Sequence, residues 1–408
     1  MKNFCAGIAL LFSLTLSAQW DALNTGTNAY LEGVSFLNVN VGLTCGYDTT
    51  NNRGKILISS DAGNSWSAAA VAGSVYPRLH SITYVNSNVA IAVGDSGVIL
   101  RSTDSGLNWD TLPRFSSKQL NRVHFVNDTL GFCAGNGGIL CRTSDSGASW
   151  DTLNSGTVLN LHDIDFISTT TGLVTGDGGW IAKTNDGGDT WTLAPNQLFG
   201  FFNGRSVDFR DAGNAICVGQ YGYALKSFDG GNSWLDISSL LGTNNDLNSV
   251  RFVTPLGGII AGANGAIFRT TNGGLNWNEE SDSTQARPYY DISFSDDTTA
   301  YICGATGKMV TNRFDISSVV AYAAPALDLN AYPNPFSDRI TINYSSDENA
   351  EAFIDVLDLT GRSLVRINEG GQYPGNHAAT LELSHLPAGV YMLRVSCGGV
   401  GVVRVVKN

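Results

Sequence analysis

The sequence predicts an all-β protein, a seven-bladed β-propeller followed by a small C-terminal Ig-like β-sandwich. A segment that ends in tryptophan recurs every 41 to 43 residues between residues 59 and 277. Each repeat contains four short runs typical of strands, and about forty residues per four strands is the period of a propeller blade. From about residue 327 the repeat stops, but apolar residues still alternate between turn signals.

The composition agrees with this fold and excludes several partners. Glycine makes up 47 of 408 residues, which suits many tight turns, and only 15% of residues are charged. The net charge is −12 and the acids are scattered, so neither nucleic acid nor an anionic membrane surface is an expected partner. We expect no metal, because no CxxC pair or metal-ligand histidine spacing occurs. We also expect a monomer without a cofactor.

Residues 1–18 are typical of a signal peptide. Lys2 gives the positive start, residues 8–16 the apolar run, and Ala18 the small residue before the cleavage point. The apolar run is too short to span a bilayer, which needs about 20 residues, and no comparable run follows. We therefore predict an exported protein without a transmembrane segment.

Six cysteines remain after cleavage. Export would permit disulfides, but four of the six recur near a glycine at similar places in the repeats, as small apolar residues of a strand do. We predict free, buried thiols at Cys45, Cys133, Cys141, Cys217, Cys303 and Cys397.

The propeller is predicted for residues 19–314, and each of its blades combines three sequence elements. An apolar-x-aromatic triplet lies in the innermost strand at residues 34–36, 82–84, 123–125, 164–166, 207–209, 250–252 and 292–294. A G-x-x-G turn joins the next two strands at residues 94–97, 135–138, 176–179, 219–222, 262–265 and 304–307, with a looser version from Gly46. An S/T-x-D-x-G-x-x-W segment then opens the fourth strand.

The seventh unit has no such tryptophan segment of its own. Residues 20–27 (WDALNTGT) closely match residues 150–157 (WDTLNSGT), so the N-terminus should supply the missing outer strand. We predict that this strand closes the ring, with Trp20 beside the hairpin that begins at Gly304.

The aspartates of the repeated segment are predicted to be structural. Each can accept backbone N–H groups across its turn, the following glycine can take the left-handed conformation, and the tryptophan can cover the core between blades. A metal-binding or catalytic role would not require the residue in nearly every blade. The set comprises Asp61, Asp104, Asp145, Asp186 and Asp229 with Trp66, Trp109, Trp150, Trp191, Trp234 and Trp277, while Asn272 replaces the sixth aspartate.

With these motifs the chain resembles the Asp-box repeats of bacterial neuraminidases. It resembles more closely the propellers of photosystem II stability and assembly factors, which share the V-x-F, G-x-x-G and D-G-G-x-x-W rhythm. The resemblance covers about residues 19–314 and implies an architecture rather than an activity.

Residues 315–326 are predicted to form a linker and residues 327–408 a sorting domain. The order of the YPNPF, D-x-x-G-R and L-P-x-G-x-Y motifs resembles the C-terminal sorting domain of the type IX secretion system of Bacteroidetes. That resemblance implies passage across the outer membrane, the secretion machinery as a partner, and a secreted or surface location. A carbohydrate-binding or adhesive sandwich would explain the alternation but not the motif order. The motif residues are Tyr332, Pro333, Asn334, Pro335, Phe336, Gly361, Arg362, Gly389, Tyr391 and Lys407.

Positions that vary between blades are candidates for recognition. Polar residues that begin the innermost strands should surround the channel mouth, and aromatic and arginine residues of the adjoining loops should lie on the same face. Such side chains suit sugars or extended peptides, although a solvated channel would look similar. The predicted contacts, with the sector from Trp180 to Arg205 favoured, are Glu32, His80, His162, Trp180, Phe201, Phe202, Arg205, Tyr221, Arg287 and Tyr290.

Two functions remain open. The first is a non-catalytic binding or adhesion module for a glycan or a protein, displayed outside the cell. The second is a glycoside hydrolase that uses two carboxylates at the channel mouth, drawn from Asp163, Asp165, Asp208 and Asp291. We expect the first, because a sialidase signature is absent and xyloglucanase-type enzymes resemble two joined propellers rather than one.

Overall fold

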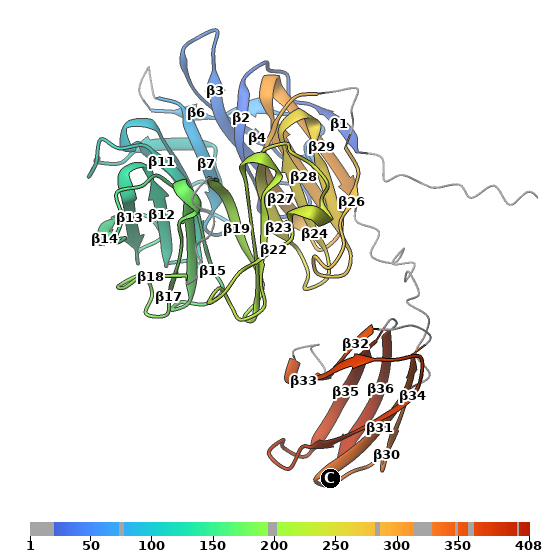
Figure 1. Ribbon diagram of the computed structural model, residues 1–408. Helices are drawn as coiled ribbons and strands as arrows, with labels where there is room; N and C mark the ends of the chain where they lie inside the picture. The colour runs from blue at the N-terminus through green and yellow to red at the C-terminus, as the bar shows by residue number, and fades with distance from the viewer. Residues whose placement is uncertain are drawn as a thin grey trace, which may run out of the picture. The chain divides into compact units, whose positions relative to one another are not determined.

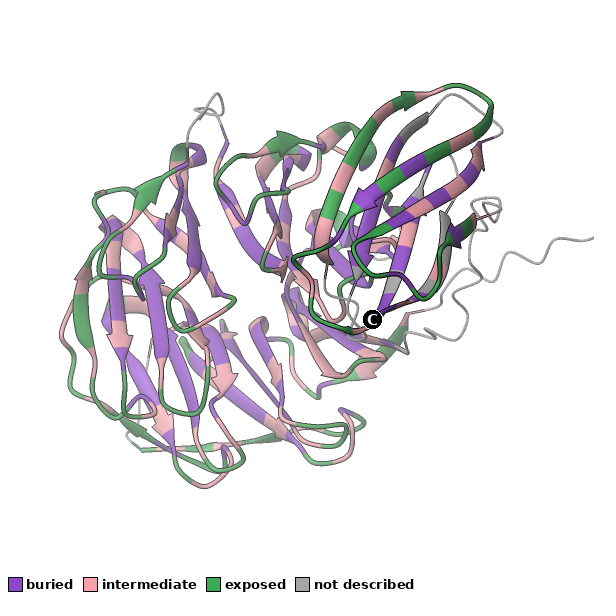
Figure 2. Cartoon of the chain, turned by 90° about the horizontal axis from the view of Figure 1, so that it is seen from below, coloured by how far each residue is buried: buried purple, intermediate pink, exposed green. Residues whose placement is uncertain are grey.

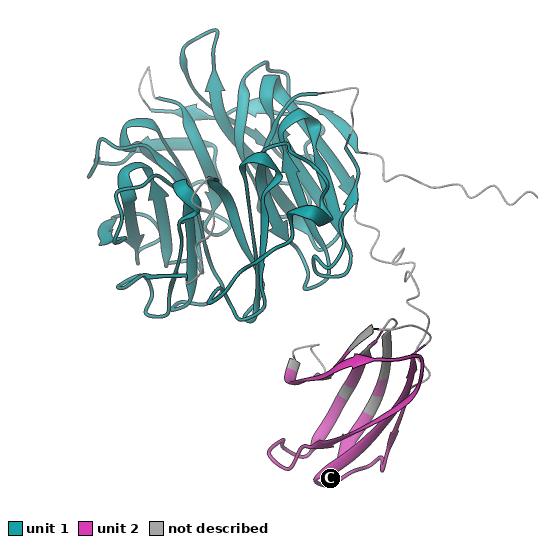
Figure 3. Ribbon diagram, in the orientation of Figure 1, with its two compact units in different colours: residues 1–314 teal, residues 315–408 magenta. Residues whose placement is uncertain are grey.

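The computed structural model describes residues 20–72, 77–194, 202–281, 286–313, 329–346, 350–357, 363–397 and 400–408. The predicted signal peptide and linker lie outside these ranges. The chain divides into two compact units, residues 1–314 and 315–408 (Figure 3). Within the described ranges no helix is long and apolar enough to cross a membrane.

Within the described ranges, the first unit contains seven blades with four antiparallel strands each (Figure 1). Blade 1 is β2 (Tyr30–Phe36), β3 (Gly42–Asp48), β4 (Arg53–Ser59) and β5 (Ser67–Ala68); blade 2 is β7 (Leu79–Tyr84), β8 (Ala90–Gly94), β9 (Ile99–Ser102) and β10 (Asn108–Thr111), with β6 (Ala70–Val71) added in parallel. Blade 3 is β11 (Leu120–Phe125), β12 (Gly131–Gly135), β13 (Ile139–Thr143) and β14 (Asp151–Asn154); blade 4 is β15 (Leu161–Phe166), β16 (Gly172–Gly176), β17 (Ile181–Thr184) and β18 (Thr192–Leu193).

The remaining blades have the same plan. Blade 5 is β19 (Gly204–Asp211), β20 (Asn214–Gly219), β21 (Ala224–Ser227) and β22 (Leu235–Asp236); blade 6 is β23 (Leu247–Phe252), β24 (Gly258–Gly262), β25 (Ile267–Thr270) and β26 (Asn278–Glu279). Blade 7 is β27 (Tyr289–Asp296), β28 (Thr299–Gly304), β29 (Lys308–Arg313) and β1 (Asp21–Asn24). The innermost strands β2, β7, β11, β15, β19, β23 and β27 contact one another in sequence, and β27 returns to β2, so the blades form a ring (Figure 2).

Strand β1 is the outer strand of blade 7, as the sequence predicts. It pairs antiparallel with β29 from Asp21 opposite Thr311 to Asn24 opposite Lys308. The indole of Trp20 packs against the core between blades 6 and 7 and donates to Glu280 Oε2 at 3.0 Å. The Thr25 hydroxyl donates to the carbonyl of Gly307, the last residue of the Gly304 hairpin, at 2.7 Å. The first and last parts of the unit therefore share one sheet.

The G-x-x-G turns require their glycines for two different reasons. A Cβ at Gly94 would lie 2.0 Å from the carbonyl oxygen of Arg78, because the innermost strand passes directly against it. Gly97 has φ of +68°, a conformation that glycine adopts without strain. Six of these turns contain short 3₁₀ segments, η1 (Asp95–Gly97), η2 (Asn136–Gly138), η3 (Asp177–Gly179), η4 (Gln220–Gly222), η6 (Ala263–Gly265) and η8 (Ala305–Gly307), and a further one, η5 (Ser238–Leu240), lies in a connection.

The repeated aspartates form the predicted bonds. Asp104 Oδ1 accepts the backbone N–H of Asn108 at 2.9 Å and the hydroxyl of Ser102 at 2.8 Å, while its Oδ2 accepts the Asn108 amide at 2.6 Å. The backbone N–H of the residue four positions later donates in the same way to Oδ1 of Asp61, Asp145, Asp186 and Asp229, and of Asn272 in blade 6. The glycine two positions after the aspartate has positive φ in every blade with a segment of this kind, at Gly63, Gly106, Gly147, Gly188, Gly231 and Gly274.

The segment tryptophans cover the cores between blades. Trp109 is 1% exposed and its Nε1 donates to the Gly106 carbonyl at 2.9 Å, and Trp66 makes the same bond to Gly63. Trp150, Trp191, Trp234 and Trp277 pack against the next cores along the ring. The six described cysteines are buried thiols, as predicted.

The second unit is a two-sheet β structure around one core. Its sheets are β30 (Leu329–Tyr332), β31 (Arg339–Ser346) and β34 (Gly375–Glu382), and β33 (Ser363–Gln372), β32 (Ala350–Leu357), β35 (Gly389–Ser396) and β36 (Val400–Lys407). The YPNPF motif fixes the last strand, since Phe336 is 1% exposed in the core and Asn334 Oδ1 accepts the Val406 N–H. The Tyr391 hydroxyl donates to the Pro387 carbonyl within L-P-x-G-x-Y.

The other sorting-motif residues divide between surface and core. Tyr332 is half exposed, whereas Lys407 is buried. Pro333 and Pro335 lie beside Asn334 at the surface, and Gly389 begins β35. Gly361 and Arg362 lie outside the described residues.

Candidate functional site

The two ends of the ring differ in what they present. In blades 2 to 7 the innermost strand begins beside a G-x-x-G turn, for example Leu79 opposite Gly94. At the other end, in blades 1 to 6, an Asp-box turn contacts the loop that follows the innermost strand, for example where the N–H of Ala62 donates to the Asn40 carbonyl. We call these ends the G-x-x-G face and the Asp-box face. The residues predicted to surround the channel mouth lie on the G-x-x-G face.

Blades 1 and 2 join at this face through a charged cluster. Glu32 contacts the Arg78 guanidinium and accepts a bond from His80 Nδ1 at 2.7 Å, while His80 Nε2 lies 2.8 Å from Asp95 Oδ1. Burial alone would lower the pKa of His80, but the hydrogen bonds and charges of Glu32 and Asp95 outweigh it and raise the pKa. The Glu32 side chain is nearly buried. Glu32 and His80, both predicted to contact a ligand, therefore bind each other instead of facing an open cavity.

Side chains of the favoured sector in blades 4 and 5 also contact neighbouring residues. His162 Nε2 lies 2.7 Å from Asp177 Oδ1, and burial lowers the pKa of His162 despite that carboxylate. Trp180 packs against the blade 4 core. Arg205 has a buried Nε without a hydrogen-bond partner in the described part of the chain.

The aromatic residues of that sector require one correction. Phe202 is 1% exposed and stacks on Tyr223 with ring centroids 4.6 Å apart, so it belongs to the blade 5 core and does not face a ligand. Tyr221 is 64% exposed, and Phe201 lies outside the described residues. Within the described residues, one predicted ring of this sector therefore lies in a core and another is exposed.

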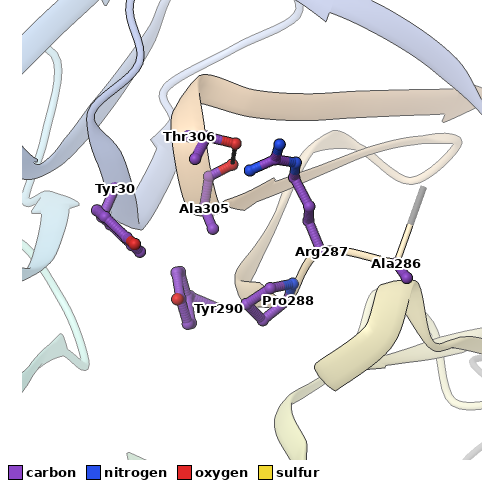
Figure 4. Close-up of a pocket in the computed structure, with 7 residues that line it drawn as sticks. All are labelled: Tyr30, Ala286, Arg287, Pro288, Tyr290, Ala305 and Thr306. Atoms are coloured by element: carbon purple, nitrogen blue, oxygen red, sulfur yellow. Dashed lines mark hydrogen bonds between the residues drawn. The ribbon is translucent and has the colours of Figure 1, made fainter.

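A cavity of about 660 Å³ lies instead between blades 7 and 1 on the G-x-x-G face, and we call it the Tyr30–Tyr290 cleft. It is lined by Tyr30, Arg287, Pro288, Tyr290 and Thr306, with Ala286 and Ala305. The two tyrosine rings lie together on one side and the guanidinium extends toward Thr306 on the other (Figure 4). Burial raises the pKa of Tyr290, so its hydroxyl stays protonated and can donate.

The cleft borders the hairpin that replaces the G-x-x-G turn in blade 1. Strands β3 and β4 extend to the pair Asp48–Arg53, so this hairpin is longer than those of the other blades. Tyr47 pairs with Tyr30 across β2 and β3, and the Arg78 guanidinium lies 6.0 Å from the Tyr47 ring centroid. The hairpin thus contacts the beginning of blade 2 through Arg78.

Sequence reasoning found Arg287 and Tyr290 but missed Tyr30, Tyr47, Pro288 and Thr306. Two signals could have found them. The loose G-x-x-G match at Gly46 marks blade 1 as the blade with a different turn. Tyr30 and Pro288 lie two residues before Glu32 and Tyr290, which belong to the predicted ring of residues around the channel mouth. The carbonyl of that position packs against the first turn glycine, which fixes its place on this face.

Comparisons with known proteins agree with both units. Residues 143–278 match the family model of the photosynthesis system II assembly factor YCF48, and residues 330–407 match that of the secretion system C-terminal sorting domain. A solved structure described as YCF48 bound to D1 peptide is 19% identical with a TM-score of 0.62, covering 72% of this chain and 95% of that one. YCF48 from Cyanidioschyzon merolae is 16% identical with a TM-score of 0.58, covering 72% and 98%. No curated protein matches the chain.

The chain joins a YCF48-like propeller to a type IX sorting domain. The sorting domain indicates secretion through the type IX system to the cell surface or the extracellular space, and its machinery is therefore a partner. At these identities the solved structures show the fold alone.

The carboxylates considered for catalysis line the inside of the YCF48-like propeller, and three of them bind arginines across it. Arg122 of blade 3 reaches Asp163 at 3.1 Å and Asp291 of blade 7 at 3.0 Å. Arg251 of blade 6 lies 3.3 Å from Asp163 and 3.5 Å from Asp208. Burial would raise the pKa of Asp163, but the two guanidinium groups outweigh it and lower the pKa.

Asp165 and Asp208 also connect neighbouring blades. Asp165 Oδ2 accepts the Phe209 N–H and Asp208 Oδ2 accepts the Phe252 N–H, both at 2.8 Å, which satisfies donors on the inner edge of the next blade. Burial and the nearby Asp165 raise the pKa of Asp208 well above its ordinary value. In the described part of the chain no three His, Cys, Asp or Glu side chains are arranged to hold a metal ion.

Proposed function

We propose that the chain is an exported, non-catalytic binding module that holds an extended segment of another protein in the Tyr30–Tyr290 cleft. The observation that carries the proposal is the convergence of two tyrosines, a proline and an arginine from blades 7 and 1 on one cavity of about 660 Å³. Tyrosine and arginine dominate the energetics of protein recognition, because each offers a broad apolar surface together with hydrogen-bonding atoms.

The surroundings of the cleft favour a peptide over a large flat partner. The tyrosine rings and Pro288 offer apolar surface on which side chains can pack, and the Arg287 guanidinium and Tyr290 hydroxyl can donate to backbone carbonyls. Arg287 is exposed and has no ion-pair partner within the described residues. A related precedent is the structure described as YCF48 bound to D1 peptide, although its 19% identity extends to the fold alone.

Catalysis by the inner carboxylates is the less favoured function. One oxygen of Asp165 and one of Asp208 are engaged with the next blade, and Asp163 is held between two arginines. A glycoside hydrolase needs one carboxylate free to donate a proton and a second free to attack or activate water. Turnover of a glycan that is abolished by Asp165→Asn would favour that function instead.

The mature chain, residues 19–408, can be tested on peptide and glycan arrays, with the strongest peptide then resynthesised for titration. We expect peptide binding that weakens by about tenfold or more in Tyr290→Ala, since an anchor residue contributes more than about 1.4 kcal/mol. Tyr221→Ala is the matched control, because Tyr221 is an exposed tyrosine of blade 5 on the same face.

Two results would overturn the proposal. The first is binding confined to glycans. The second is peptide binding that Tyr290→Ala and Arg287→Gln leave unchanged while Trp180→Ala or Arg205→Ala abolishes it, which would return the site to blades 4 and 5. Circular dichroism of each variant would establish that the fold is retained.

A further inference from the structure

Two cysteines face each other across the second and third strands of blade 3. Cys133 in β12 lies directly opposite Cys141 in β13. Both side chains are buried in the core that blades 2 and 3 share, and both are thiols in the structure. We propose that oxidation joins Cys133 and Cys141 by a disulfide in the exported protein and so closes the hairpin of blade 3 covalently.

The backbone places the two sulfur atoms close together. Residues directly opposite in an antiparallel pair have Cα atoms about 4.5 or 5.5 Å apart, and a disulfide spans about 4.4–6.8 Å between its Cα atoms. Burial raises the pKa of the Cys133 thiol well above its ordinary value, and the Cys141 side chain, which is close enough to form a hydrogen bond, raises that pKa further. The two thiols are therefore neighbours, and the bond requires no change of strand register.

The second cysteine of the pair distinguishes blade 3 from the other blades. In blade 5 Cys217 has the place of Cys133, but it faces Leu225. A small apolar residue at this place explains a cysteine on one strand, whereas packing does not require another cysteine opposite it. The equivalent pairs in the remaining blades are Thr44 with Leu57, Ala92 with Leu100, Val174 with Ala182, Ile260 with Phe268 and Ile302 with Val310.

The secretion route and the sequence spacing both favour the bond. The sorting domain indicates secretion, and disulfides form and persist in secreted proteins. Cys133 and Cys141 are eight positions apart, whereas Cys141 and Cys217 are 76 positions apart. Because the entropic cost of closing a loop rises with its length, Cys133 and Cys141 meet most readily in the unfolded chain. Both are fully buried in the folded ring, so the bond should form before blade 3 packs against blade 2.

The oxidation is a thiol–disulfide exchange with a disulfide-bonded thiol oxidoreductase. The thiolate of one cysteine attacks a sulfur of the oxidant's disulfide, which gives a mixed disulfide and releases one thiolate of the oxidant. The thiolate of the other cysteine then attacks the cysteine sulfur of the mixed disulfide, which forms the Cys133–Cys141 bond and releases the second oxidant thiolate. Two electrons and two protons pass from the cysteines to the oxidant, whose disulfide becomes a dithiol.

Peptide mapping of the secreted chain can test the bond, because trypsin releases both cysteines in a single peptide, residues 123–142. The chain is collected outside the cell, unfolded in iodoacetamide without a reductant, and digested. We expect this peptide to carry no alkyl group and to be about 2 Da lighter than its dithiol form, because two hydrogen atoms are lost. After reduction it should take up two alkyl groups.

Two controls separate the bond from poor access of the reagent. Cys217, which faces Leu225, lies in the tryptic peptide 211–226 and should be alkylated without reduction. Cys141→Ala gives blade 3 the residue that blade 4 has at this place, Ala182, and removes one partner of the bond. In that variant Cys133 should also be alkylated without reduction.

Two outcomes would overturn the proposal. The first is a peptide 123–142 from the secreted chain that carries two alkyl groups before reduction, because both thiols then persist after export. The second is a link from either cysteine to a residue outside this peptide, which the mass of the joined peptides would reveal. The result does not depend on the proposed peptide site, so Tyr290→Ala should leave the bond intact.

Discussion

The Asp-box face and the G-x-x-G face of the propeller are built by different rules. On the Asp-box face one set of bonds recurs in six blades, with the same acceptor atom and the same spacing of four residues. On the G-x-x-G face the backbone turn recurs but the side chains change, from Glu32 in blade 1 to His80 in blade 2 and Arg205 in blade 5. The residues that repeat from blade to blade are therefore those on which formation of the ring depends.

The difference is greatest where the repeat itself is broken. Blade 1 replaces its G-x-x-G turn with a longer hairpin, and blade 7 borrows its outer strand from the N-terminus. The Tyr30–Tyr290 cleft lies between these two blades. The cleft thus lies where the chain departs from the repeat.

The largest effect is expected from removal of the borrowed strand. A mature chain that begins at residue 26 loses the pairing of β1 with β29, the Trp20 contact with Glu280 and the Thr25 bond to Gly307. Several hydrogen bonds of about 1 kcal/mol each and the burial of Trp20 together amount to roughly 5 kcal/mol, comparable to the whole stability of many domains. Denaturant unfolding should show this loss against a chain that begins at residue 19. Equal unfolding midpoints would mean that the ring does not depend on β1.

The second effect concerns the ion pairs that cross the channel. Asp163→Asn removes the carboxylate shared by Arg122 and Arg251 and leaves two buried guanidinium groups less well matched. Breaking a buried ion pair by removing one partner costs about 3–5 kcal/mol. Urea denaturation at pH 7 should reveal a loss of that size, and a loss below about 1 kcal/mol would show that the channel charges are not coupled as described.

The third effect tests whether the Asp-box stabilises the propeller through its repeated hydrogen bonds. Asp104→Ala should destabilise the propeller by about 1–2 kcal/mol, because the N–H and amide of Asn108 lose their acceptors. Blade 6 allows the reverse substitution, because Asn272 occupies the position of Asp104 and accepts the N–H of Asn276, the equivalent of Asn108. Asn272→Asp should be neutral or stabilising at pH 7. Destabilisation by both changes would contradict a shared structural role.

This Asp-box effect also has a defined pH dependence. The hydrogen bonds from the Asn108 side chain and backbone hold the pKa of Asp104 below its ordinary value. The stabilisation is therefore present above the unfolded pKa of about 3.9 and is lost as the pH falls through the lower folded value. Acid unfolding of the Asp104→Ala variant should accordingly differ least from the parent at the lowest pH.

The sequence predicts the fold better than the site for a physical reason. Blade number, the role of β1 and the aspartate bonds follow from backbone geometry that every repeat must satisfy, so an internal comparison of blades reveals them. Exposure of single side chains depends on packing across blades. Phe202 looked like a ligand contact by position but lies in a core, and Trp180 is partly buried against a core, while Tyr30 faces a cavity between blades 7 and 1.

No loss of stability is expected for Asp208→Asn, in contrast to Asp163→Asn inside the same channel. The raised pKa of Asp208, caused by burial and Asp165, means that its contribution to stability is full below the unfolded pKa of about 3.9 and declines as the pH rises through the folded value. Asparagine is neutral at every pH and its oxygen can still accept the Phe252 N–H. The variant should match the parent in unfolding free energy near pH 4 and exceed it progressively toward pH 8. A variant that is less stable than the parent at pH 8 would show that Asp208 is ionised in the folded ring and is held by Arg251.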